Sequence, residues 1–359
     1  MSPKPLDLRR VRTYPLRRRR SVVAADLLAR AVRPTVPVRA FLDGLPRILA
    51  ANALRDAARA IADSHRHRRP VVVGMGAHVI KVGLSPIMID LMERGVVTAI
   101  AMNGAGIIHD FELAFHGATS EDVGPGLADG RFGMAQETGA FLNERIRDGA
   151  ARGLGMGRAI GEAIEKARLP HRRFSLLATA ARLGIPATVH VAVGTDIIHM
   201  HPGADGAAIG ATSLRDFHLL ASVVAGLDGG VFLNLGSAVI IPEVFVKALN
   251  IARNLGHRVR RITCIDMDFI RHYRPHVNVV TRPTAAGGHG IELTGHHEIM
   301  FPLLAAAVLS ELGLGRMRGG ARRARRRARG ALRRQRRAKR RSPRKTTGRK
   351  TGSPRRGRQ

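Results

Sequence analysis

Apolar runs that end in glycine and polar residues, and then give way to helical periodicity, constrain the fold of this chain most strongly. The pattern is clearest at residues 71–81, 98–110 and 188–202, where apolar residues lead into glycines, carboxylates or histidines. Strands that alternate with helices need crossover connections, which produce a mostly parallel sheet with helices on both faces. We therefore predict a Rossmann-like α/β fold in which the polar groups meet at the carboxyl edge of the sheet.

The spacing of apolar residues predicts the individual elements. Before the first strand, we expect helices at about residues 22–32 and 38–67, the second interrupted near 44–46, and these should form a packed layer or an oligomer contact. Strands are expected at residues 71–74, 97–102, 187–193, 230–235, 260–266 and 276–281, and helices at 85–94, 106–116, 131–147, 156–167, 172–184, 212–226, 241–255 and 296–313.

The net charge of +33 is concentrated at the two ends of the chain. Residues 1–20 contain eight basic residues and one acid, and residues 316–359 contain 22 basic residues and no acid, whereas the part between them is nearly neutral. We therefore expect a basic N-terminal arm (1–20), an α/β domain (21–315) and a disordered Arg/Lys-rich tail (316–359). The tail would either bind nucleic acid or another polyanion without sequence preference, or have no essential role.

Cysteine content and hydropathy exclude several classes of protein. Cys264 is the only cysteine, so an internal disulfide and a zinc site with several cysteines are both excluded. The sequence has no uncharged apolar run of about 18 residues, which a membrane span would need. We expect a cytoplasmic protein without an export signal.

Two glycine-rich strand ends predict a nucleotide site. Residues 74–78 read Gly-Met-Gly-Ala-His, although Val79 takes the place of a third glycine in the usual fingerprint. Residues 103–106 read Asn-Gly-Ala-Gly and precede a predicted helix, whose amino end would attract a diphosphate. Asp196, at the third strand end, could bind ribose or amide groups, or it could cap the next helix.

Four histidines and a carboxylate lie in two short stretches, His199 with His201 and His296 with His297 and Glu298. If the two loops meet, these side chains could hold a divalent metal. Acid/base catalysis or simple hydrogen bonding are the alternatives. The preceding glycine cluster at residues 287–290 predicts a mobile loop that would suit a lid.

Five motifs lie in order along the chain: Gly-Ala-His-Val-Ile-Lys-Val-Gly (76–83), Asn-Gly-Ala-Gly (103–106), Gly-Thr-Asp (194–196), Asn-Leu-Gly-Ser (234–237) and Phe-Pro-Leu-Leu (301–304). Together they resemble the deoxyhypusine synthase family, particularly its bacterial synthase-like branch. The resemblance covers roughly residues 10–313, and it implies a Rossmann-like subunit in a homotetramer with NAD and spermidine bound at dimer interfaces. In that family NAD takes a hydride from spermidine, and an aminobutyl group then passes through an active-site lysine to an acceptor amine.

The chain matches the family well at the positions that bind NAD, but it does not match at the positions that bind the polyamine. Glu298 stands where the family has its lysine, and a carboxylate cannot form the covalent imine that a lysine forms. His201 replaces a family acid, so the substrate is expected to carry less positive charge than spermidine. The candidate catalytic residues are His201, His296, His297 and Glu298. The candidate NAD-binding residues are Gly76, Ala77, His78, Asn103, Gly104, Ala105, Gly106, Thr195, Asp196, Gly236 and Ser237.

The favoured interpretation is an NAD-dependent enzyme that oxidises an amine substrate, with or without aminoalkyl transfer to an acceptor amine. Two alternatives stay open at this point. One is a metal-dependent hydrolase or lyase that uses the histidine cluster. The other is an inactive scaffold with a polyanion-binding tail.

Overall fold

A six-stranded parallel sheet forms the centre of the structure, a computed structural model that describes residues 3–313. The strand order is β3-β2-β1-β4-β5-β6, and Val73 of β1 pairs with Ile100 of β2 and with Leu233 of β4. This arrangement confirms the predicted Rossmann-like α/β fold. The predicted tail, residues 316–359, lies outside the described residues. The strands are β1 (Val71–Met75), β2 (Ala99–Asn103), β3 (Ala187–His190), β4 (Val231–Leu235), β5 (Thr263–Asp268) and β6 (His289–Thr294).

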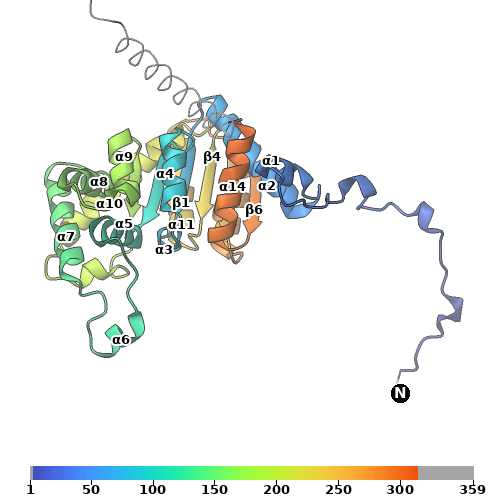
Figure 1. Cartoon of the computed structure of the whole chain (residues 1–359), viewed down its shortest axis with the longest axis horizontal. Helices are drawn as coiled ribbons and strands as arrows, with labels where there is room; N and C mark the ends of the chain where they lie inside the picture. Colours follow the sequence, from blue (N-terminus) through green and yellow to red (C-terminus); the bar gives the residue numbers. More distant parts are fainter. Residues whose placement is uncertain (1–2, 314–359) are drawn as a thin grey trace, which may run out of the picture. The chain divides into compact units, whose positions relative to one another are not determined.

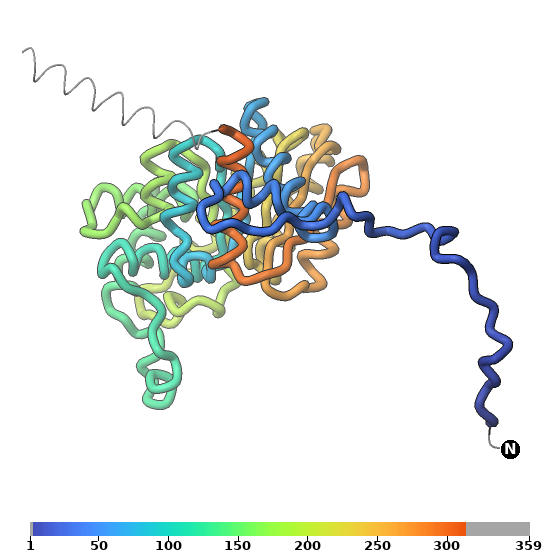
Figure 2. Tube along the Cα trace, turned by 45° about the vertical axis from the view of Figure 1, so that its right-hand side comes forward, coloured from blue at the N-terminus to red at the C-terminus, as the bar shows by residue number. Residues whose placement is uncertain are grey.

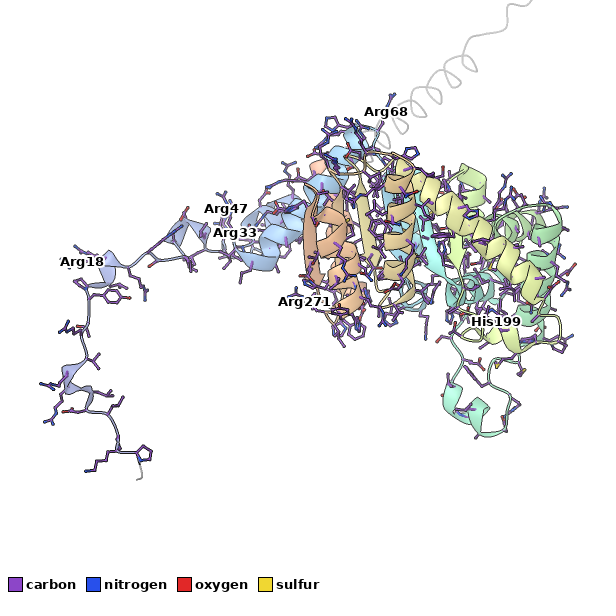
Figure 3. All side chains as sticks on the ribbon, turned by 180° about the vertical axis from the view of Figure 1, so that it is seen from behind. Arg18, Arg33, Arg47, Arg68, His199 and Arg271 are labelled. Atoms are coloured by element: carbon purple, nitrogen blue, oxygen red, sulfur yellow. The ribbon has the colours of Figure 1, made fainter. Side chains whose placement is uncertain are left out.

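Helices cover both faces of the sheet (Figure 1). On one face α2, α4 and α14 pack over the strands, while α10 and α11 cover the other face, which is visible from behind in Figure 3. The helices are α1 (Val38–Gly44), α2 (Leu49–Arg66), α3 (His78–Lys81), α4 (Ser85–Glu93), α5 (Gly104–His116), α6 (Val123–Ala128), α7 (Gln136–Ala151), α8 (Met156–Ala167), α9 (Leu176–Leu183), α10 (Gly206–Ala225), α11 (Ile240–Asn254), α12 (Tyr273–Pro275), α13 (Arg282–Thr284) and α14 (His297–Glu311).

Burial on both faces explains why β1 is a continuous apolar run. All five residues of β1 are buried, and successive side chains enter different cores: Val73 faces α2 and α14, and Val72 faces α10 and α11. A strand that is covered on both sides has no solvent face for polar residues. The predicted 97–102 and 230–235 strands are present for the same reason, with small shifts at their ends.

The sixth strand was predicted in the wrong place. Residues 276–281, a run rich in valine, form a π-helix between α12 and α13, and the strand lies at His289–Thr294. The predicted lid is therefore wrong in part, because His289 and Gly290 belong to β6. Gly288 and Gly290 are also closely packed: a Cβ at Gly290 would lie 2.7 Å from the Val280 side chain.

The N-terminal residues form less helix than predicted. Within residues 22–32 the structure has one 3₁₀ turn, Ala25–Leu27, and the side chains of Val22 and Val32 are exposed. A short helix without a packing partner is unstable in water, which explains the difference. Figure 2 shows residues 3–24 as an extended run, and it shows residues 117–135, which contain α6, as a projection from the helices and strands.

Candidate functional site

The site lies where the direction of strand order reverses, between β1 and β4. Doubly wound sheets bind ligands at this point, outside the carboxyl ends of the strands. Here the loops after β1 and β4 are in close contact, since the Gly76 N–H donates to the Leu235 carbonyl at 3.1 Å. A Cβ at Gly76 would lie 2.3 Å from the Gly236 carbonyl oxygen, so this close backbone contact requires a glycine at position 76. Gly236 itself has a φ of +67°, in the region that favours glycine.

His297 projects into this crevice from the first turn of α14. Its side chain is 1% exposed, and its Nε2 lies 3.5 Å from Oδ1 of Asp268, at the end of β5. A Cβ at Gly236 would meet the His297 ring at 2.8 Å, and the exposed His78 ring lies edge-on at 5.4 Å between ring centres. The Met267 backbone also lies within reach of the ring and favours its protonated form. The crevice therefore contains a buried imidazole next to a carboxylate.

Burial controls the protonation of His297. Desolvation lowers the pKa of His297 below its usual value, and the charge of Asp268 opposes that shift only in part. At neutral pH the imidazole is therefore uncharged and can accept a proton. Asp266, two residues before Asp268, has its pKa raised to about 6 by burial, although the Asn234 amide donates to it at 2.7 Å.

A second polar cluster lies on the other side of β1, at the ends of β2 and β3. Oδ1 of Asn103, Oδ2 of Asp196 and Nε2 of His199 are buried atoms without a hydrogen-bond partner in the described chain. His199 Nδ1 accepts from the backbone N–H of Gly194 at 3.1 Å, so the ring proton resides on Nε2. The cluster thus offers two acceptors and one donor to a ligand. Buried groups without partners are rare in folded proteins and are typical of binding sites.

Asp196 occupies the amino end of α5, where the glycines predicted a diphosphate. A Cβ at Gly104 would lie 1.9 Å from Oδ2 of Asp196, and the Ala105 N–H forms a hydrogen bond with this carboxylate. Asp196 also caps the 3₁₀ turn Ile197–Met200 together with His199. Burial raises the pKa of Asp196 to about 6. The first turn of α5 therefore contacts a carboxylate of the chain itself, which would repel a diphosphate at the same point.

The four predicted catalytic residues do not form one group. His201 lies next to α7, and its Nε2 lies 2.8 Å from the carbonyl of Gly133, which precedes that helix. His296 and Glu298 are exposed, with 71% and 48% of their side-chain surfaces accessible and 4.0 Å between His296 Nδ1 and Glu298 Oε1. His297 is the member that enters the crevice. Figure 3 labels two residues near these regions, His199 in the turn after β3 and Arg271 in the loop after β5, and they lie well apart.

Other predicted cofactor residues have structural contacts. The Thr195 hydroxyl donates to the Ala192 carbonyl at 2.7 Å, and the Ser237 hydroxyl accepts from the Ile241 N–H at 3.2 Å at the start of α11. Gly106 packs on Met102, whose Sδ would lie 2.7 Å from an added Cβ. Ala77 precedes α3 and is buried. Their binding of NAD stays a prediction.

Asp266 and Asp268 were not among the residues predicted from the sequence, and Asn234 was predicted only as part of the 234–237 motif. The signal was present, since residues 263–268 read Thr-Cys-Ile-Asp-Met-Asp, an apolar strand that ends in carboxylates. This is the pattern that marked the other three strand ends. It was overlooked because no glycine follows it.

The predicted metal histidines do not meet. Among residues 3–313, no group of three or more His, Cys, Asp or Glu side chains could hold a metal ion. His199 and His201 make the contacts described above on the β3 side, whereas His297 pairs with Asp268. In the same part of the chain, no helix is long and apolar enough to cross a membrane.

No family model and no curated protein matches this chain. Among solved structures it is similar to ArgZ, an arginine dihydrolase from the ornithine–ammonia cycle in cyanobacteria, with 17% identity and a TM-score of 0.44 over 72% of this chain and 31% of that one. It is also similar to AgrE in complex with ornithine and NAD⁺, with 15% identity and a TM-score of 0.45 over 72% and 32% of the two chains. The chain thus spans about a third of the length of these two proteins.

A third similar structure is that of a protein assigned as a deoxyhypusine synthase from Entamoeba histolytica. It is 12% identical, has a TM-score of 0.45, and the match covers 77% of this chain and 94% of that one. At these identities the likeness concerns the fold. Fold and site together define a Rossmann-like α/β protein with a polar crevice at the reversal point of its sheet.

Proposed function

We propose that this protein is an NAD-dependent enzyme, similar to the deoxyhypusine synthase family, that oxidises an amine. The observation that supports this most is the placement of two incomplete polar clusters on either side of β1. One cluster has hydrogen-bonding groups without partners, and the other has an uncharged buried imidazole beside a carboxylate. The first suits a cofactor and the second suits proton transfer.

The cluster at β2 and β3 fits hydroxyl or amide groups better than it fits a diphosphate. Asn103 Oδ1 and Asp196 Oδ2 can accept from ribose hydroxyls or from a carboxamide NH₂, and His199 Nε2–H can donate to an oxygen. We assign these three residues to the nicotinamide–ribose part of NAD. The cofactor would supply a hydride acceptor for the substrate carbon.

His297 would act as the base in the oxidation. A protonated amine, R₂CH–NH₃⁺, becomes an iminium ion, R₂C=NH₂⁺, when it loses one proton from nitrogen and one hydride from carbon. His297 would take the proton, and Asp268 at 3.5 Å would stabilise the imidazolium that forms. Burial lowers the pKa of His297 and so keeps it unprotonated until the substrate binds.

Group transfer would have to proceed without a lysine adduct at position 298, because Glu298 lies exposed on the first turn of α14. The acceptor amine would attack the iminium carbon directly and expel the original amine, and the hydride held by the reduced cofactor would then convert the new imine to an amine. Otherwise the reaction would stop at oxidation. A homotetramer with sites at dimer interfaces belongs to the same proposal. The metal-dependent alternative has no observation that favours it over this one.

The test measures NADH formation from a panel of amines, with His297→Gln and the matched control His296→Gln. Loss of a general base typically lowers the rate about 10²–10⁴-fold, and we expect this for His297→Gln alone. In the parent enzyme, kcat/KM should fall on the acid side with an apparent pKa below 6.5, because burial lowers the pKa of His297 from that value. Equal losses in the two variants would contradict the assignment.

NAD binding is measured separately by calorimetry, with Asp196→Asn alongside. The amide keeps an oxygen for the helix cap but removes the charged acceptor, so affinity for NAD should fall about tenfold or more. If the parent protein does not bind NAD at millimolar concentration, the nucleotide assignment is wrong.

A further inference from the structure

A cavity of about 790 Å³ lies at the opposite end of α14 from His297. We propose that it binds a small anion with two or more phosphoryl groups. Its walls come from the segment before α1, from α1 and α2, and from the last turn of α14. α14 has 15 residues, so its rise of about 1.5 Å per residue places the cavity about 20 Å from the crevice. The cavity is thus independent of the proposed NAD site.

The charged lining of the cavity is mostly cationic, and its acids are largely paired. Asp43 lies 3.9 Å from the Arg39 guanidinium, and Asp56 lies 3.3 Å from that of Arg59. The remaining acid in the lining is Glu311. The five arginines of the lining are Arg30, Arg39, Arg47, Arg55 and Arg59.

Arg30 and Arg47 have no side-chain hydrogen bond or ion pair within the described residues. The fold nevertheless pairs their two segments in antiparallel fashion, because the Arg30 N–H donates to the Gly44 carbonyl and the Arg47 N–H donates to the Leu27 carbonyl, both at 2.9 Å. Arg30 and Arg47 thus lie at opposite ends of the same short pairing. The Arg30 side chain runs over Gly44, where an added Cβ would lie 3.8 Å from Arg30 Cβ. Two like charges on paired segments attract an anion between them.

Arg55 stabilises the wall that carries these two residues. Its guanidinium donates to the carbonyls of Leu42, Leu45 and Pro46 at 3.0, 2.6 and 2.9 Å, which ties the turn between α1 and α2 to α2 itself. Arg39 connects the other wall, since it donates to the Ser310 carbonyl of α14 at 3.3 Å. Contacts within the chain therefore hold the segments of Arg30 and Arg47 in place before any ligand binds.

The chemistry of these groups selects the ligand. A guanidinium presents a planar fork of donors that matches phosphate oxygens in pairs, and such charge-assisted bonds are stronger than neutral ones. Arg30 and Arg47 come from separate segments, so each can bind its own phosphoryl group. A lining drawn from several elements around one cavity favours a small molecule over a nucleic-acid strand. Figure 3 labels Arg47 and its neighbour Arg33 on this part of the chain.

The experiment titrates the full chain with inorganic pyrophosphate by calorimetry at about 0.3 M NaCl, which weakens nonspecific binding to the basic ends. We compare the parent with Arg30→Gln/Arg47→Gln and with the control Arg12→Gln/Arg18→Gln, which removes the same charge from exposed residues of the arm. One saturable site per chain is expected in parent and control. In Arg30→Gln/Arg47→Gln its affinity should fall about tenfold or more.

A second measurement is made on the parent alone, so its result does not depend on whether the variant folds. Pyrophosphate should slow hydrogen exchange at the Arg30 and Arg47 amides of the parent, because a ligand that bridges the two side chains stabilises the backbone pairing. Failure of the parent to bind pyrophosphate in a saturable way would overturn the proposal. So would an equal loss of affinity in the control variant, which would assign the binding to general positive charge.

Discussion

Three consecutive polar side chains, His296, His297 and Glu298, have different environments at the start of α14. His296 precedes the helix and stacks on Phe269 with ring centres 6.1 Å apart, and Glu298 faces solvent. Only His297 points back toward the ends of β4 and β5, because residues next to each other on a helix point about 100° apart. Of these three side chains, His297 is therefore the one that can act as a base in the crevice.

Gly76 provides a prediction about stability at the residue scale. In Gly76→Ala the new methyl group would meet the Gly236 carbonyl oxygen at 2.3 Å, and a backbone atom cannot turn aside as a side chain can. We expect the free energy of unfolding to fall by about 2 kcal/mol, as for an overpacked core. Urea unfolding followed by circular dichroism measures it.

Gly210→Ala is the matched control for that substitution. Gly210 lies in the second turn of α10 with nothing within 4 Å of an added Cβ, so alanine should stabilise the helix by about 0.5–1 kcal/mol. If the two alanine variants change stability in the same direction, the close contact between the β1 and β4 loops is not as described.

At the scale of elements, a buried carboxylate joins three segments. Asp216 of α10 accepts from the Gly157 N–H at the start of α8 and from the Val189 N–H of β3, both at 2.9 Å. Gly155 makes this approach possible, since a Cβ there would lie 1.8 Å from Oδ1 of Asp216. Burial raises the pKa of Asp216 to about 7, against the lowering effect of these N–H donors. The edge strand β3 is thus positioned by a group whose charge is costly in the folded state.

Substitution of Asp216 should change how stability depends on pH. Because the folded pKa lies near 7 and the ordinary value is 3.8, the folded chain holds a proton between these pH values that the unfolded chain has lost. The contribution of Asp216 to stability therefore falls as pH rises through this window. In Asp216→Asn that decline should be absent from curves of unfolding free energy measured between pH 4 and pH 7.5. Parallel curves for parent and variant would show that Asp216 does not titrate in this range.

For the whole molecule, the N-terminal residues divide into a part that packs and a part that does not. α2 packs against α14 and β6, and it buries Leu54, Ala58 and Ile61 in the main core. Residues 3–20 are exposed, and their hydrogen bonds are local ones such as that between Arg9 and Asp7. The sheet therefore depends on α2 for cover and does not depend on the arm.

Two truncations test this division. Removal of residues 1–20 should leave the free energy of unfolding within about 0.5 kcal/mol of the parent, as is usual for changes at exposed sites. Removal of residues 1–66 should abolish cooperative unfolding, because it exposes the apolar face of α14. Denaturation curves at equal protein concentration give the answer. A cooperative transition at the parent midpoint in the shorter protein would contradict the packing of α2.

The sequence by itself determined the fold class, the position of most elements, and four of the five strand ends that form the site. Periodicity was sufficient there because β1, β2 and β4 are buried on both faces, and α8 and α14 have long apolar patterns. It failed at residues 276–281, whose β-branched residues favour a strand in isolation but form a π-helix where Asn278, Val279 and Val280 pack. The alternation of Ile291 and Leu293 with polar neighbours did signal β6, but the adjacent glycines suggested a loop.

Tertiary structure alone decided which polar residues meet. Sequence spacing cannot show that His297 reaches Asp268 rather than His201, or that Asp196 lies against Gly104 at the start of α5. These contacts join residues that are far apart in the chain, and they depend on strand order and on the angle at which each helix leaves the sheet. The physical reason is that local patterns specify which face of an element is buried, whereas packing of all the elements together specifies what that face touches.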